Sequence, residues 1–189
     1  HFLRRRHSIR VYRIKPVPRE TIHWVIEIAR YAPSGHNSQC VQWLVLDTKE
    51  ELHHLAGIVV DWMRHLIQNQ PELAADMHLE RTVKRWENGV DVVLRHAPAV
   101  VVAYAHKDNR MAAAASTLAL SYLDLAANTV GLGCCWAGYF NGAANVFPAM
   151  IESLALPEGH QPFGSMMIGY PKYGYHRLPA RKPPPIIWR

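Results

Sequence analysis

A basic run near the start of the chain combines the residue types that bind phosphate. Arg6, His7, Ser8 and Arg10 occur within five positions. A guanidinium forms charge-assisted, bidentate hydrogen bonds to phosphate oxygens, and a serine hydroxyl adds a further donor. In an extended backbone alternate side chains share a face, so Ile9 is expected to turn into the core. The run predicts an anion site, and a solvated basic end is the alternative.

Two further segments have the composition of ligand-binding loops. Residues 33–39 read Pro-Ser-Gly-His-Asn-Ser-Gln, and Asn and Gln amides recognise a heterocycle edge with paired donors and acceptors. Residues 131–138 read Gly-Leu-Gly-Cys-Cys-Trp-Ala-Gly, whose glycines allow a flat ligand to approach backbone N–H groups. This segment follows a helix and lacks a third glycine, which excludes a dinucleotide fingerprint. Ordinary turn chemistry and core packing are the alternatives.

The distribution of charge favours a compact anion over a long polyanion. The 189 residues carry 21 Lys+Arg and 15 Asp+Glu, a formal net charge of +6. Residues 1–20 have a net charge of +6 and residues 172–189 of +5, so the intervening body is acidic. We therefore predict that the two ends of the chain converge on one anion. A basic nucleic-acid-binding module is the alternative from another class.

The sequence lacks the motifs of several common classes of protein. The 12 histidines and 3 cysteines form no His-Glu-x-x-His or Cys-x-x-Cys, so we predict no metal site. A Gly-x-Ser-x-Gly elbow and a P-loop are also missing. No apolar run reaches the roughly 18 residues of a membrane span, so no membrane partner is expected. The low cysteine count and the lack of a signal-peptide pattern favour the cytoplasm.

The chain length predicts a single domain over residues 1–189, and the sequence contains neither repeats nor an interdomain linker. Apolar spacing predicts helices at 19–31, 50–70, 72–88, 111–130 and 145–154. Strands are expected at 41–46, 98–105 and 164–169, and an extended segment at 134–140. The 111–130 helix is apolar nearly all round, which is typical of a domain centre or an oligomer interface.

The C-terminal tail is rich in proline and ends on apolar side chains. Three successive prolines at 183–185 favour an extended backbone. Ile186, Ile187 and Trp188 are costly to leave in water. We therefore expect the tail to dock on another surface, such as a neighbouring subunit.

Six short segments follow one another in a characteristic order. They are Arg-His-Ser-Ile-Arg, Ala-Pro-Ser-Gly-His-Asn-Ser-Gln, Ala-Pro-Ala-Val-Val-Val, Gly-Leu-Gly-Cys-Cys-Trp-Ala-Gly, Gly-Tyr-Pro and Pro-Ala-Arg-Lys. In this order the chain resembles the nitroreductase family of FMN-dependent oxidoreductases over essentially its whole length. The resemblance implies an α+β fold with a mixed, mainly antiparallel sheet flanked by helices. It also implies an intertwined homodimer in which each C-terminal tail adds a strand to the partner's sheet.

The resemblance also implies three sets of FMN-binding residues. Those expected at the phosphate and ribityl chain are Arg6, His7, Ser8, Arg10, Arg181 and Lys182. Those expected from the second subunit, over the isoalloxazine ring, are Pro33, Ser34, Gly35, Asn37 and Gln39. Those expected beside the ring, with backbone N–H groups near N5 and O4, are Cys135, Trp136, Ala137 and Gly138. The sequence departs from the family at Cys40, where members usually have proline, and no contact is assigned within 69–95.

The implied chemistry belongs to the flavin, so no catalytic side chain is assigned. FMN accepts a hydride at N5 and passes it, or electrons, to an acceptor. We expect NAD(P)H or ferredoxin as donor, and nitro compounds, quinones or related small molecules as acceptors. The chain looks most like the subgroup with a preceding ferredoxin domain, which would make His1 a cut after an iron–sulfur domain. Flavin fragmentation and reductive dehalogenation are the alternatives within the fold.

Overall fold

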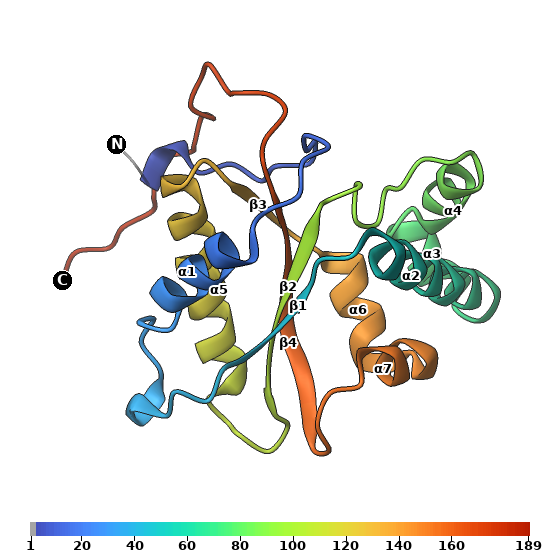
Figure 1. Cartoon of the computed structure of the whole chain (residues 1–189), viewed down its shortest axis with the longest axis horizontal. Helices are drawn as coiled ribbons and strands as arrows, with labels where there is room; N and C mark the ends of the chain where they lie inside the picture. The colour runs from blue at the N-terminus through green and yellow to red at the C-terminus, as the bar shows by residue number, and fades with distance from the viewer. Residues whose placement is uncertain (1–2) are drawn as a thin grey trace.

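A sheet of four strands runs through the middle of the molecule (Figure 1). The strands are β1 (Gln42–Leu46), β2 (Ala99–His106), β3 (Gly133–Trp136) and β4 (His160–Gly169). They pair in the order β1-β2-β4-β3, and each pairing is antiparallel, as predicted for a mainly antiparallel sheet. This computed structural model describes residues 3–189, so the expected boundary at His1 lies outside the described residues.

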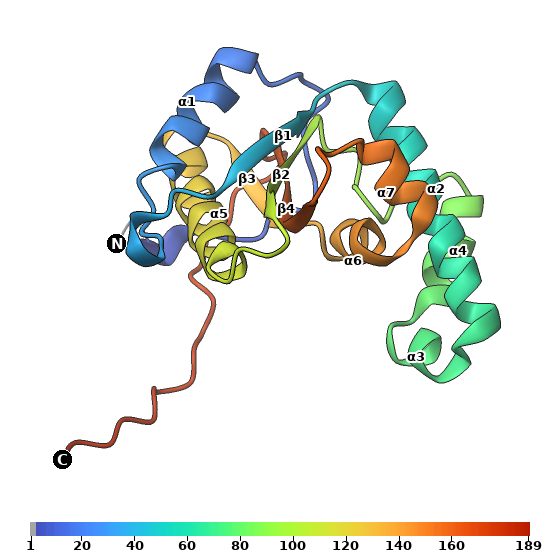
Figure 2. The ribbon, with the colours of Figure 1, turned by 90° about the horizontal axis from the view of Figure 1, so that it is seen from below.

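Helices cover both faces of the sheet (Figure 1 and Figure 2). One face carries α1 (Arg19–Ala29) and α5 (Ala112–Thr129). The other carries α2 (Lys49–Asn69), α6 (Gly138–Val146) and α7 (Pro148–Leu154). The segment predicted as helical at 72–88 forms α3 (Pro71–Asp76) and α4 (Leu79–Glu87), which pack beside α2. Single 3₁₀ turns occur at Leu3–Arg5 and Gly35–Asn37.

Alternating side chains of β2 divide the apolar core into two halves. Val100 and Val102 pack with α2, α6 and α7, whereas Val101 and Ala103 pack with α1 and α5. Successive residues of a strand point to opposite faces, so a strand covered on both sides must be apolar throughout. Residues 99–103 are almost completely buried, which confirms the prediction of a strand buried on both faces.

The two ends of the domain run side by side along the edge of the sheet at β3. The backbone N–H of Ile9 donates to the carbonyl of Cys134 at 2.9 Å. The N–H of Arg13 donates to the carbonyl of Tyr170 at 2.8 Å, and a further backbone bond of 3.0 Å joins Lys172 to Val11. These bonds bring segments far apart in the sequence together, so the N-terminal basic run lies next to the start of the C-terminal tail.

Two of the element predictions were wrong in the segment after β3. Residues 138–140, predicted as extended, form the first turn of α6, and the predicted 145–154 helix is split between α6 and α7. Phe140, Ala143 and Ala144 form the buried face of α6, a helical spacing too short to stand out in a glycine-rich segment. Pro148 begins α7 because proline fits the first helical position, where no N–H is needed.

Close packing between the basic run and β3 makes Gly133 a sensitive position. A Cβ at Gly133 would collide with the Ile9 side chain and would lie 3.1 Å from Pro171 Cγ. We expect Gly133→Ala to lower the free energy of unfolding by about 1–3 kcal/mol, the usual cost of overpacking. Chemical denaturation measures this change. Gly174→Ala, with no atom within 4 Å of the added Cβ, is the matched control, and an equal loss in both variants would contradict the packing account.

Candidate functional site

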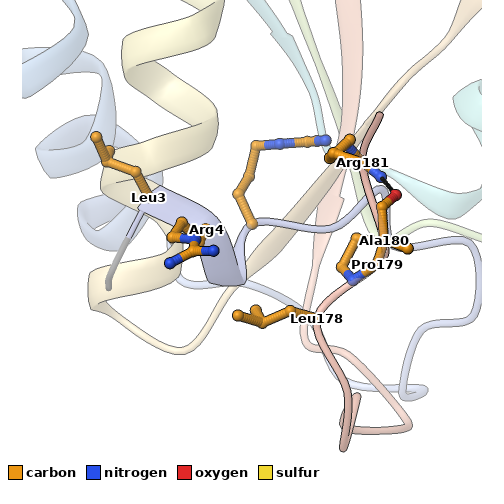
Figure 3. A pocket seen from close by; sticks show the side chains of 7 residues that line it. Leu3, Arg4, Leu178, Pro179, Ala180 and Arg181 are labelled. Atoms are coloured by element: carbon orange, nitrogen blue, oxygen red, sulfur yellow. Dashed lines mark hydrogen bonds between the residues drawn. The ribbon is translucent and has the colours of Figure 1, made fainter. Parts of the chain in front are cut away.

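A cavity of about 520 Å³ lies where the two ends of the chain meet. Its lining includes Arg4 and Arg6 from the N-terminal segment and Arg181 from the tail, but no acidic side chain. Figure 3 shows Arg4 and Arg181 on opposite sides of this space. We refer to it as the arginine pocket. Three guanidinium groups around one cavity make a strong site for an anion such as phosphate.

Arg6 is held in the arginine pocket by a buried carboxylate. Its Nη1 lies 3.1 Å from Oδ2 of Asp124, a residue of α5 that is 3% exposed. Burial raises the pKa of Asp124, and the hydrogen bond and charge of Arg6 oppose this shift only in part. Sequence reasoning selected neither Asp124 nor Arg4 as a site residue.

The other residues of the basic run, His7, Ser8 and Arg10, do not line the pocket. The imidazole of His7 stacks on the ring of Tyr175, with centroids 4.1 Å apart and planes 2° from parallel. Ile9 is buried and Arg10 is exposed, which confirms the predicted alternation. The Nη1 of Arg10 donates to the carbonyl of Ser8 at 3.4 Å. Lys182 follows Arg181 in the exposed tail but does not line the pocket.

The segment from Cys135 to Gly138 presents backbone donors at the outer edge of the sheet. The N–H of Ala137 donates to the carbonyl of Ser165 on β4 at 2.9 Å, so this donor is occupied. In an antiparallel ladder the groups of alternate residues point away from the paired strand, which directs the N–H of Trp136 outward. Gly138 is the first residue of α6, so its N–H has no partner within the helix.

Charged groups from several segments act on Cys135 of β3. Burial raises the pKa of the Cys135 thiol, the charges of Arg10, Arg95 and Arg6 oppose that shift, and the charge of Asp124 adds to it. The charge of Arg95 therefore acts on a residue of β3, although sequence reasoning assigned no contact within 69–95. Arg95 and His96 both adopt left-handed backbone conformations, with φ of 57° and 52°. Such a pair of non-glycine residues is rare and has no sequence signature, so Arg95 could not have been found from the pattern.

The 33–39 loop lies far from the arginine pocket in the same chain. Gly35 packs against the side chain of Met111, the residue before α5. Asp124, which holds Arg6, lies 13 residues further along, about 20 Å at the α-helical rise. Figure 1 shows the loop and the N-terminal segment at opposite ends of α5. The same loop contains Pro33, Ser34, Asn37 and Gln39. One copy of the chain therefore does not bring these predicted residues to the pocket.

Apolar side chains are exposed on the outer faces of α1 and α5 and on the tail. Trp24 on α1 and Tyr122 on α5 are 44% and 40% exposed. Ile187 and Trp188 are 84% and 87% exposed, at the end of a tail that extends away from the body in Figure 2. Exposed apolar surface of this kind marks an interaction site.

Residues 3–189 bring no three His, Cys, Asp or Glu side chains into an arrangement that could hold a metal ion. Across the same residues, none of the helices combines the length and the apolar character needed to cross a membrane.

The structure is an α+β fold with helices on both faces of one antiparallel sheet and an arginine-lined pocket built from both ends of the chain. The chain belongs to the nitroreductase family, whose family model matches residues 3–170. This finding confirms the resemblance and the fold predicted from the sequence.

Solved structures share the fold at low sequence identity. A nitroreductase with bound FMN from Bacteroides fragilis has a TM-score of 0.81 and 21% identity, covering 100% of this chain and 97% of that chain. A BluB-like flavoprotein from Clostridium difficile has a TM-score of 0.77 and 19% identity, covering 96% and 93%. An iodotyrosine deiodinase bound to FMN and 3-iodo-L-tyrosine has a TM-score of 0.71 and 18% identity, covering 100% and 96%.

The raised pKa of Asp124 predicts how stability depends on pH. Since the folded protein disfavours the ionised carboxylate, this group lowers stability at pH values above its raised pKa, and the loss disappears as pH falls toward the ordinary value. We expect Asp124→Asn to be more stable than the wild type at pH 8, with the difference shrinking under acid conditions. Denaturant melts of the flavin-free protein between pH 4 and 8 measure this. A difference that grows as pH falls would contradict the account.

Proposed function

We propose that the chain is an FMN-dependent oxidoreductase that reduces nitro compounds, quinones or related acceptors in the cytoplasm. The observation that carries this proposal is the arginine pocket, in which Arg4, Arg6 and Arg181 meet from opposite ends of the chain. Family membership supplies the reaction class, and FMN-bound structures with the same fold supply the cofactor. We propose NAD(P)H or ferredoxin as the electron donor.

The residues around the pocket fit FMN. The guanidinium groups of Arg6 and Arg181 would bind the phosphate, and His7, Ser8 and Arg10, which follow Arg6 in the basic run, would bind the ribityl chain. The outward N–H of Trp136 and that of Gly138 would donate to polar atoms at the ring edge. When bound, FMN would supply hydride acceptance and donation at N5.

The charges beside the β3 edge suit a ring that gains electrons. Arg10 and Arg95 oppose the raised pKa of Cys135, so they act on the same region in which the ring would lie. Fixed positive charge favours a ligand on which negative charge develops. We propose Arg95 as the contact from the middle segment that sequence reasoning left unassigned.

We further propose a homodimer in which the partner completes the site. The 33–39 loop is about 20 Å along α5 from the arginine pocket, which supports the proposal that the loop contacts the ring from a second copy. The exposed apolar side chains of α1 and α5 would meet at the interface. The extended tail would bury Ile186, Ile187 and Trp188 against the partner's sheet.

Steady-state turnover of the FMN-loaded protein tests the proposed reaction. We expect NADH or NADPH, or reduced ferredoxin, to support reduction of nitrofurazone and menadione. Consumption of FMN itself under oxygen would instead indicate flavin fragmentation, and deiodination of 3-iodotyrosine would indicate reductive dehalogenation. Flavin-loaded protein that performs none of these reactions would contradict the oxidoreductase assignment.

A further inference from the structure

A buried carboxylate beneath the arginine pocket has no other evident function. The Asp124 side chain is 5% exposed, and its Oδ2 accepts from Nη1 of Arg6 at 3.1 Å. Its second oxygen, Oδ1, is buried and has no hydrogen-bond partner within residues 3–189. The neighbouring core positions of α5 are apolar, among them Leu120 and Leu123. A charged group in this setting calls for an explanation, since a leucine would pack there at no electrostatic cost.

Asp124 uses only one nitrogen of the Arg6 guanidinium. The remaining guanidinium N–H groups of Arg6 make no hydrogen bond to the side chains and backbone that the structure describes, and its side chain is 35% exposed and lines the arginine pocket. A guanidinium has five N–H donors in a fixed plane, so anchoring Nη1 restricts the orientation of the others. An arginine already held in one orientation loses less conformational entropy when it binds an anion.

We propose that Asp124 is a positioning residue that holds the Arg6 guanidinium in place to bind the phosphate of the flavin cofactor. The inference rests on the proposed function and adds a residue on which that function depends. The cost of Asp124 to stability supports the proposal. Burial raises the pKa of Asp124, so the ionised carboxylate lowers the free energy of unfolding and does not serve to stabilise the fold. The charged and titratable groups that act on or respond to Asp124 are Arg6, Tyr12, Cys134 and Cys135.

If Asp124 acted through its negative charge alone, its removal would change FMN affinity in the opposite direction. Removing the carboxylate leaves the pocket more positive, so simple attraction would tighten phosphate binding in every neutral variant. Positioning predicts that the result depends on whether the new side chain can accept a hydrogen bond. Asp124→Leu keeps the branched shape at Cγ but has no acceptor, whereas Asp124→Asn keeps an amide oxygen in reach of Arg6.

Equilibrium binding of FMN and riboflavin to the full chain separates these accounts, because riboflavin lacks the phosphate. We expect Asp124→Leu to bind FMN about tenfold more weakly and riboflavin as well as the wild type does. Asp124→Asn should bind FMN within about threefold of the wild type. In an Arg6→Ala background, Asp124→Leu should have no further effect. The matched control is Asp47→Asn, which breaks an arginine–carboxylate pair with Arg19 outside the pocket.

Four results would overturn the proposal. Asp124→Leu and the wild type could bind FMN equally, Asp124→Leu could weaken FMN and riboflavin alike, or both neutral variants could bind FMN more tightly. An effect that persists without Arg6 would likewise exclude positioning through that arginine. Each of these leaves wild-type FMN binding intact, so the proposed function stands. Failure of the wild type to bind FMN would overturn both proposals.

Discussion

Arg181→Ala weakens FMN binding about 10- to 100-fold and leaves riboflavin binding nearly unchanged, if the tail supplies one of the phosphate-binding guanidinium groups. Charge-assisted hydrogen bonds contribute about 1.5–3 kcal/mol each, which corresponds to this range. The effect is specific to phosphate because Arg181 lines the arginine pocket with Arg4 and Arg6. Fluorescence titration of the flavin-free protein with each flavin measures the two affinities.

Arg177→Ala is the matched control for this prediction. Arg177 is exposed in the same tail, four residues earlier, and does not line the pocket. We expect its replacement to change FMN affinity less than twofold. Equal losses at Arg177 and Arg181 would mean that the tail acts only through its overall charge, and the converging ends would then have no specific role.

Removal of residues 183–189 should convert the proposed dimer into monomers and release most of the FMN. The side chains of Ile186, Ile187 and Trp188 are 57%, 84% and 87% exposed, and burial of each would contribute about 1.5–3 kcal/mol. We expect the dimer dissociation constant to rise at least about 100-fold. Light scattering coupled to gel filtration gives the mass, and absorbance across the same peak gives the bound flavin.

Deletion of Arg189 alone is the control for the truncation, because it removes charge and leaves the apolar side chains. The shorter deletion should remain dimeric and keep its flavin. A 1–182 chain that stays dimeric and yellow would contradict the exchange of tails. A dimer that persists but loses flavin would indicate that the tail contributes to the flavin site and not to the dimer interface.

Local patterns were enough to predict most of the elements and the convergence of the chain ends. The apolar residues of β2 and α5 form segments long enough to be recognised as a strand and a helix. The distribution of charge along the chain can be counted without knowledge of the fold. The arginine pocket itself brings Arg6 and Arg181 together as the charge pattern predicted. The strand order was not predicted, since periodicity does not report which strands are neighbours, and the family resemblance implied only a mainly antiparallel sheet.

The residues that were missed depend on contacts between distant segments. Asp124 gains its significance from Arg6, which is 118 positions away, so its own neighbours in α5 give no signal. Arg95, whose charge acts on Cys135 of β3, lies in an irregular stretch of backbone that no composition rule predicts. The N–H of Ala137 was expected to face the ring, but pairing with Ser165 directs it into the sheet. Pairing partners are set by the tertiary fold, which explains why these details needed the structure.

The visible absorption spectrum of the full chain, supplied with FMN and washed free of excess cofactor, tests the central claim most directly. The account predicts a yellow protein with flavin bands corresponding to one FMN per chain, which bleach when NADH, NADPH or dithionite is added without oxygen. A folded protein that stays colourless after exposure to FMN would contradict the account.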